Sequence, residues 1–139
     1  GFDIHPECGL PTPRTGKEAL RTHTDGEGHN VVHQDVEIRP GQTYAASVWV
    51  KARDLHGTGF GATAGDSAGL ALCELDGNGT ILVRHAKVEL TKATDYVKLE
   101  TTFAAQPNTR ILRFLLDTVI GCKYDQGSVT YDDCALTAR

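Results

Sequence analysis

Methionine is absent from this 139-residue sequence, and tryptophan occurs only once. Without a methionine at position 1, we expect the chain to start inside a longer polypeptide. No apolar run approaches the roughly 18 residues of a membrane-spanning helix, and residues 1–6 lack a signal-peptide pattern. The 14 Lys and Arg and the 18 Asp and Glu form no long block of one sign, which argues against a nucleic-acid-binding surface. We therefore expect a single domain, residues 1–139, excised from a larger protein, with no nucleic-acid or membrane partner.

The four cysteines, Cys8, Cys73, Cys122 and Cys134, include no C-x-x-C pair, which argues against a zinc finger or ribbon. They permit three fully paired connectivities. One or two disulfides would form outside the cytosol, so we expect a secreted or extracellular protein; buried free thiols are the alternative. Cys122 and Cys134 flank a predicted turn and strand, which makes them a candidate pair.

Short stretches of alternating apolar and polar residues recur between turns rich in Gly, Pro, Asn and Asp, which is typical of strands. Residues 39–42 (RPGQ) predict a tight turn between two strands, and residues 76–79 (DGNG) predict a hairpin. The predicted strands cover residues 31–38, 43–52, 68–75, 80–90, 96–103, 110–119 and 127–136. About eight strands without a helix indicate an all-β fold, a two-sheet antiparallel β-sandwich.

Alternation within the predicted strands separates core residues from residues on the opposite face. In residues 44–51 the predicted core side chains are Tyr44, Ala46, Val48 and Val50, which leaves Ala45, Ser47, Trp49 and Lys51 facing outward. In residues 31–38 the side chains predicted to face inward are Val32, Gln34, Val36 and Ile38, which leaves Val31, His33, Asp35 and Glu37 outward. In residues 110–119 the predicted core side chains are Leu112, Phe114 and Leu116, which leaves Arg113, Leu115 and Asp117 outward.

Six segments carry a family pattern in their order and spacing: residues 1–3 (GFD), 16–20 (GKEAL), 32–36 (VHQDV), 40–44 (PGQTY), 47–52 (SVWVKA) and 129–133 (VTYDD). Together they resemble the galactose-binding-like jelly-roll carbohydrate-binding modules attached to xylanases and glucanases. The chain departs from that pattern at His33 and Tyr96, where family members have another aromatic and a tryptophan, and it lacks most of the opening strand. The resemblance implies a jelly roll that binds a polysaccharide or oligosaccharide beside the catalytic domain of a parent chain.

Four outward residues are candidates for carbohydrate binding: His33, Trp49, Arg113 and Asp117. A flat indole on a polar face offers a surface on which a sugar ring can stack, and His33 is predicted to lie beside it. Arg113 and Asp117 are suited to hydrogen bonds with adjacent sugar hydroxyls. The alternatives are a Trp49 covered by a loop and a surface ion pair that contributes little.

The resemblance also implies a structural calcium ion held by Asp3, Asp132 and a backbone carbonyl near Lys17. Carboxylate and carbonyl oxygens are the ligands that Ca²⁺ prefers. The alternative is two unrelated acidic sites, because the sequence has no continuous calcium-loop motif here.

Catalytic motifs are missing from the sequence. The six histidines include no H-E-x-x-H motif, and the three serines, Ser47, Ser67 and Ser128, lie in no G-x-S-x-G elbow. We expect no enzyme, but a non-catalytic carbohydrate-binding module that targets a parent polysaccharide-active enzyme or surface protein to a glycan. The alternative is a structural or protein-interaction β-sandwich without a sugar site, as in a phage tail, an adhesin or an accessory domain. The aromatic content of 6% favours this alternative.

Overall fold

The computed structural model describes residues 20–23, 28–53, 55, 65–120 and 128–139. In these residues there is no helix that could span a membrane. The strands of this part of the chain are β1 (Leu20–His23), β2 (Gly28–Glu37), β3 (Thr43–Arg53), β4 (Ser67–Leu75), β5 (Ile81–Arg84), β6 (Val88–Leu90), β7 (Thr94–Ala104), β8 (Ile111–Ile120) and β9 (Ser128–Ala138).

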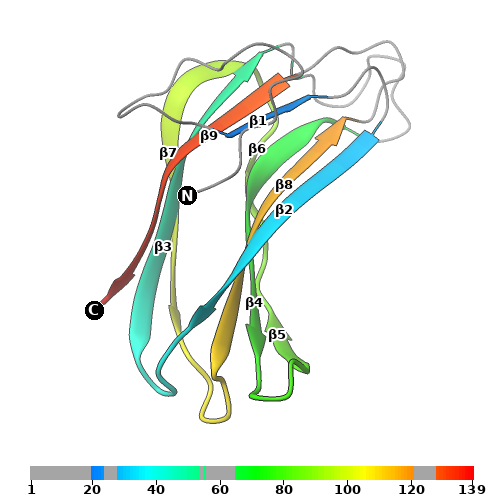
Figure 1. Ribbon diagram of the computed structural model, residues 1–139. Coiled ribbons are helices and arrows are strands. Elements are labelled where there is room, and N and C mark those ends of the chain that lie inside the picture. Colours follow the sequence, from blue (N-terminus) through cyan, green and yellow to red (C-terminus); the bar gives the residue numbers. More distant parts are fainter. Residues whose placement is uncertain (1–19, 24–27, 54, 56–64, 121–127) are drawn as a thin grey trace.

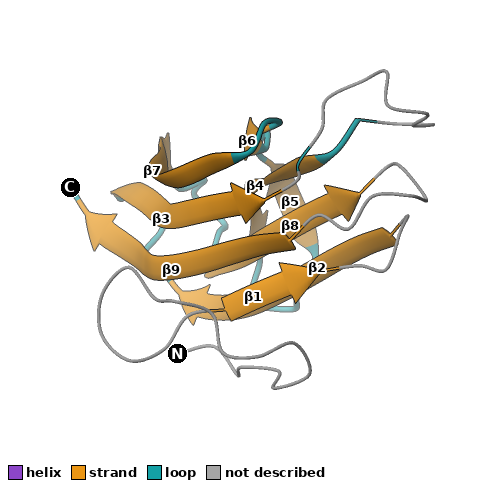
Figure 2. Ribbon diagram, turned by 90° about the horizontal axis from the view of Figure 1, so that it is seen from above, coloured by secondary structure: helices purple, strands orange, loops and turns teal. Residues whose placement is uncertain are grey.

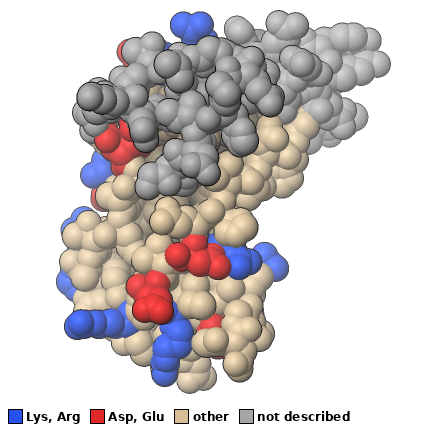
Figure 3. Space-filling model, viewed as in Figure 1, with Lys and Arg blue, Asp and Glu red and all other residues tan. Residues whose placement is uncertain are grey.

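Two antiparallel sheets pack face to face (Figures 1 and 2). The four-stranded sheet has the order β1-β9-β3-β7. The five-stranded sheet has the order β2-β8-β4-β5, and β6 also pairs with β4. The predicted all-β sandwich is therefore confirmed. Acidic and basic side chains are interspersed on the face in Figure 3, without a large patch of one sign.

The strand predicted for residues 80–90 is two short strands, which is a correction. β5 pairs with the end of β4 at Cys73–Leu75, and β6 pairs with its beginning at Ala68–Leu70. Both strands therefore lie along the same edge of β4. The His85 amide, just after β5, still donates to the Leu72 carbonyl of β4 at 3.0 Å, and the His85 ring lies 5.1 Å from that of Phe103. The strand β1 was not predicted as a strand.

The turn predicted at residues 39–42 is present, but it connects the two sheets instead of forming a hairpin. The Gln42 amide donates to the Arg39 carbonyl at 3.3 Å, and Gly41 has φ +73°, a left-handed conformation that glycine adopts without strain. β2 lies in the five-stranded sheet and β3 in the four-stranded sheet. Residues adjacent in sequence across this turn thus end up on opposite sides of the sandwich.

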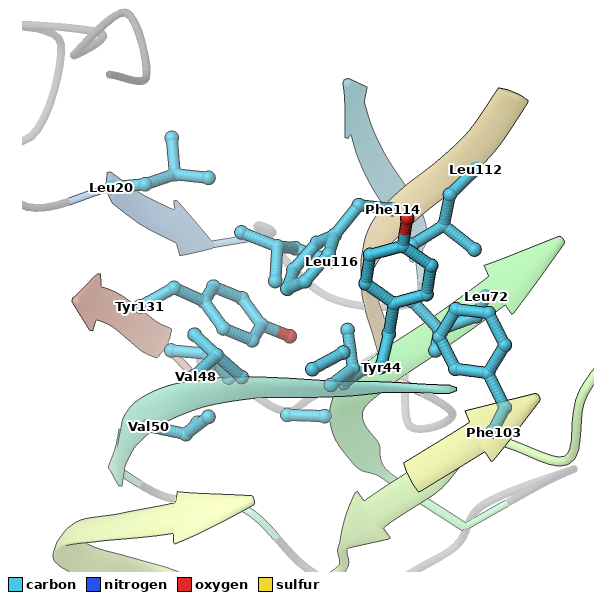
Figure 4. Close-up of a cluster of buried hydrophobic side chains, with 14 of the residues drawn as sticks. Leu20, Tyr44, Val48, Val50, Leu72, Phe103, Leu112, Phe114, Leu116 and Tyr131 are labelled. Carbon is cyan, nitrogen blue, oxygen red and sulfur yellow. The ribbon is translucent and has the colours of Figure 1, made fainter. Parts of the chain in front are cut away.

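The core lies between the sheets and contains the side chains predicted for β3 and β8. Val48, Val50, Leu112 and Leu116 have no exposed surface, and Figure 4 shows side chains of both sheets pointing toward one another. Gln34 pairs with the core residue Phe114 and so faces the inner side, as predicted, but its side chain is exposed. β2 is the last strand in the order of its sheet, so its inward side lies at the rim of the core.

The side chain of Tyr131 reaches across the core, and its hydroxyl group connects the two sheets. Tyr131 on β9 is fully buried, and its hydroxyl lies 2.8 Å from Thr118 Oγ1 and donates to the Asp117 carbonyl at 3.1 Å. Burial raises the pKa of this phenol well above its usual value. The hydroxyl therefore stays neutral, and its hydrogen bonds hold β9 against β8.

Candidate functional site

Trp49 lies on the outer face of the four-stranded sheet, as predicted. Its neighbours on β3, Val48 and Val50, point into the core, whereas the indole is on the opposite side and is half-buried. Across the sheet, Trp49 pairs with Lys98 on β7 and with Asp132 on β9. In the ladder Trp49 therefore lies between a lysine and an aspartate.

We call the outward side chains around the indole the Trp49 face: Ser47, Trp49, Lys51, Tyr96, Lys98, Glu100 and Asp132. Lys98 Nζ lies 3.1 Å from Glu100 Oε2, and the Arg139 guanidinium lies 3.9 Å from the other oxygen of Glu100. Lys51 Nζ lies 5.7 Å from the centre of the Tyr96 ring and 4.0 Å from Asp95 Oδ1. The face thus combines two aromatic rings with donors and acceptors.

Both strands beside β3 are irregular near Trp49. On β9 the pairing shifts between Ser47 and Trp49, and Asp133 has φ 48° at the irregularity. On β7 the pairing shifts just beyond Val50, opposite Lys51. β-Bulges change the direction of side chains and are common next to binding sites. The Trp49 face is therefore flanked by a bulge on each side.

His33 is not a neighbour of Trp49, which corrects the sequence-based expectation. His33 is exposed on β2 and pairs with Leu115 on β8, so it lies on the outer face of the five-stranded sheet. Trp49 lies on the outer face of the other sheet, with the core between them. The cause is the turn at residues 39–42, which connects the two sheets.

Arg113 also lies on the outer face of the five-stranded sheet, where it forms a two-pronged ion pair with Asp35. Its Nε and Nη2 donate to the two carboxylate oxygens at 2.8 and 2.9 Å. The hydrogen bonds that Arg113 donates to the Asp35 carboxylate hold the pKa of Asp35 below its usual value and raise the pKa of Arg113. The ion pair expected as the alternative for Arg113 is thus present, with Asp35 as the partner.

Asp117 has partners for both carboxylate oxygens. Lys87 Nζ donates to Oδ1 at 3.0 Å, and His29 Nε2 lies 3.1 Å from Oδ2. Burial opposes ionisation, but the hydrogen bonds from His29 and Lys87 outweigh it and hold the pKa of Asp117 below its usual value. His33, Arg113 and Asp117 thus share one outer face, but none of them lies on the Trp49 face.

Both described cysteines, Cys73 and Cys134, are free thiols. The candidate pair of Cys122 with Cys134 is therefore not formed, which corrects that expectation. Burial raises the pKa of the Cys134 thiol to about 12, and the charge of Asp132 adds to the shift. The thiol therefore stays protonated and unreactive at neutral pH. Cys8 and Cys122 lie outside the described residues.

Of the predicted calcium ligands, Asp132 is described, whereas Asp3 and Lys17 lie outside the described residues. Asp132 is 7% exposed, and its Oδ1 accepts a hydrogen bond from the Asp133 amide at 2.8 Å. A buried carboxylate is a suitable hard ligand for Ca²⁺. No cluster of three His, Cys, Asp or Glu side chains arranged for a metal occurs among the residues described. The calcium ion stays a prediction.

Sequence reasoning did not identify Tyr96 as a possible site residue, although it noted Tyr96 as a departure from the family pattern. A bulge cannot be read from the alternation of apolar and polar residues. Here the bulge determines which residues of β7 lie opposite Lys51. The ladder positions of Lys98 and Asp132 beside Trp49 were also not predicted, because strand pairing joins distant parts of the chain.

No protein-family model and no curated protein matches this chain. Solved structures do match. A family 16 carbohydrate-binding module is 20% identical over 95% of this chain and 82% of that chain, with a TM-score of 0.63. The module TmCBM61, solved in complex with β-1,4-galactotriose, is 17% identical over 91% of this chain and 74% of that chain, with a TM-score of 0.61.

A third match is the enzymatically active domain of tailspike protein 4 of bacteriophage CBA120. It is 9% identical over 87% of this chain and 19% of that chain, with a TM-score of 0.56. At these identities the similarity establishes the fold alone. The chain therefore has the jelly-roll fold of carbohydrate-binding modules.

Proposed function

We propose that this domain is a non-catalytic carbohydrate-binding module and that it holds a saccharide against Trp49. The observation that carries the proposal is the placement of the only tryptophan, half-buried on an outer sheet face, next to the ion pair of Lys98 and Glu100. An apolar ring beside polar side chains matches a sugar, which has an apolar face and hydroxyls at its edge.

Three residues of the Trp49 face, Trp49, Lys98 and Glu100, have a chemical role in this proposal. The indole contributes apolar contact area, Lys98 donates hydrogen bonds to hydroxyl oxygens, and Glu100 accepts them from hydroxyl hydrogens. Because the ion pair holds Lys98 and Glu100 near each other before a ligand arrives, less side-chain entropy is lost on binding. No reaction step is needed, since stacking and hydrogen bonding suffice for binding.

The fold supports the proposal, because structural neighbours of the chain are carbohydrate-binding modules, one of them bound to β-1,4-galactotriose. We extend the proposal to a parent polysaccharide-active enzyme or surface protein outside the cell, which the module would hold close to its glycan. Attachment to a substrate raises the effective concentration of a linked catalytic domain.

A calorimetric titration of the purified domain with soluble β-1,4-galactan, xylan and mixed-linkage β-glucan tests the proposal. At least one glycan should bind, and Trp49→Ala should weaken it by about tenfold or more, roughly 1–3 kcal/mol of binding free energy. His33→Ala, on the opposite outer face, is the matched control and should bind like the parent domain. The proposal fails if no glycan binds, or if Trp49→Ala binds as tightly as the parent while remaining folded.

The second candidate is a structural or protein-interaction sandwich without a sugar site. The low aromatic content of the sequence favours it. The same titration separates the two functions, because this candidate predicts no binding to any of the three glycans.

A further inference from the structure

The pairing of β7 with β3 is irregular opposite Lys51. Val50 pairs with Val97, but Ala52 pairs with Thr94, so both Asp95 and Tyr96 lie opposite Lys51. Two residues facing one is the geometry of a β-bulge, which bends the strand and changes the direction of a side chain. Asp95 is mostly exposed, whereas the Tyr96 side chain is half-buried.

The Tyr96 ring lies on the same face as Trp49. Lys51 follows Trp49 by two residues on β3, so the two side chains share a face. The Lys51 ammonium lies over the Tyr96 ring, 5.7 Å from its centre, which places the ring on that face as well. Since Trp49 pairs with Lys98, Tyr96 is its diagonal neighbour across the ladder, roughly 7–8 Å away.

Charges on and around this face are balanced. The cationic side chains are Lys51, Lys98 and Arg139, and the carboxylates are Asp95, Glu100 and Asp132. Lys98 lies 3.1 Å from Glu100, and Lys51 lies 4.0 Å from Asp95. A face on which lysines already have carboxylate partners has little net attraction for an acidic sugar.

We infer that Trp49 and Tyr96 form two adjacent stacking positions and that the ligand is an uncharged linear oligosaccharide covering both rings. A single sugar ring is about as large as one aromatic ring, so a monosaccharide would leave one position empty. The chain of sugars would run obliquely across the sheet from β3 to β7. Lys51 is a positioning residue, because it holds the Tyr96 ring. The inference rests on the proposed function and names its ligand class.

The test is a calorimetric series with β-1,4-linked galacto-, xylo- and cello-oligosaccharides of increasing length, starting from the monosaccharide. For the series that binds, affinity should rise about tenfold from the monosaccharide to the trisaccharide. Tyr96→Ala should remove most of this gain, whereas Tyr96→Phe should keep it. Leu82→Ala, exposed on the five-stranded sheet, is the control.

Tyr96→Leu, which keeps apolar volume without the ring, replaces Tyr96→Ala if the latter does not fold. Equal affinity for monosaccharide and trisaccharide would overturn the inference, as would an equal effect of the Tyr96 variants at every length. Tighter binding of oligogalacturonides than of neutral oligosaccharides would overturn the inference that the ligand is uncharged. In each of these cases, binding that depends on Trp49 would leave the proposed function standing. Absence of any binding would overturn both.

Discussion

Glu74 is a charged side chain that the sandwich buries completely, with 0% exposure. Its Oε1 accepts hydrogen bonds from the Gln106 amide at 2.8 Å and from the Thr109 hydroxyl at 2.7 Å. Its Oε2 lies 2.7 Å from His85 Nε2. One carboxylate thus connects β4, the segment between β5 and β6, and the turn between β7 and β8. A buried carboxylate is tolerated only with such a set of donors.

Replacing Glu74 by leucine should cost about 3–5 kcal/mol of unfolding free energy, because the buried Thr109 hydroxyl and the part-buried Gln106 amide and His85 ring would lose their acceptor. Glu74→Gln keeps the shape and should cost less. Urea denaturation of the purified domain measures both effects. Glu89→Gln, an exposed carboxylate on β6, is the control and should stay within about 0.5 kcal/mol of the parent. A Glu74→Leu variant as stable as the parent would contradict the structural role of Glu74.

Asp117 makes stability depend on pH. Its pKa in the folded state lies below the usual value, although burial opposes this, because His29 and Lys87 hydrogen-bond the carboxylate. A group with a depressed folded pKa stabilises the fold above its unfolded pKa of about 3.9, and that stabilisation is lost as the pH falls through the folded pKa. The parent domain should therefore exceed Asp117→Asn in stability at pH 7, and the difference should shrink on acidification below about pH 4.

Denaturation of both proteins between pH 2 and pH 7, at roughly physiological ionic strength, provides the measurement. Asp76→Asn at the exposed β4–β5 hairpin is unsuitable as a control, because Asp76 Oδ1 accepts the Asn78 and Thr80 amides at 2.9 Å. Glu37→Gln, at an exposed carboxylate at the end of β2, is the better control. A difference between the parent and Asp117→Asn that stays constant with pH would contradict the prediction.

At the scale of elements, β6 lies unusually close to β4. A Cβ atom added to Gly69 would lie 2.1 Å from the Val88 carbonyl oxygen and 2.9 Å from the Glu89 Cα. Both atoms belong to the backbone, so relief requires a shift of a whole strand rather than a side-chain rotation. Glycine at this position therefore permits β6 to pair with β4.

Gly69→Ala should destabilise the domain by about 3 kcal/mol, because β6 would be displaced from the ladder. Gly77→Ala is the matched control. At Gly77 an added Cβ would meet only the flexible side chain of Arg110, at an ordinary 3.9 Å. Thermal and chemical unfolding of the two variants compare the positions directly. Equal stability of Gly69→Ala and Gly77→Ala would show that β6 does not approach β4 this closely.

The β2–β3, β4–β5 and β7–β8 connections lie at the same end of the sandwich (Figure 1), and contacts between side chains link the strands there. The Arg39 amide donates to the Tyr44 hydroxyl at 2.8 Å, and the Tyr44 ring stacks on Phe103. Phe103 in turn contacts His85, the partner of Glu74. This chain of contacts connects strand ends of both sheets.

For the whole molecule, the predicted calcium ion should raise stability, because a ligand that binds only the folded state stabilises it by mass action. Thermal unfolding of the purified domain, measured in excess calcium and in excess chelator, tests this. We expect a higher midpoint with calcium, and no such difference for Asp132→Asn. An unchanged midpoint after removal of the metal from a calcium-loaded sample would rule out a stabilising site.

The part of the fold that was predictable follows from the period of two along a strand. Val48, Val50, Leu112 and Leu116 were assigned to the core from alternation alone, and Trp49 to the outside. Alternation is a local property of an extended backbone, so it can be read without knowing which strands pair. It placed Gln34 on the inner side correctly but could not show that this side is exposed on the edge strand β2, and it missed the interruption between β5 and β6.

The sequence by itself determined a two-sheet β-sandwich, its core and a tryptophan on an outer face. Only the tertiary structure decided which outward residues share a surface. His33, one turn away from the Trp49 strand, lies on the opposite side of the sandwich, whereas Lys98 and Asp132, far along the chain, lie beside the indole. The reason is that alternation specifies an inner and an outer side for each strand, while the neighbours across a sheet depend on long-range pairing and on bulges.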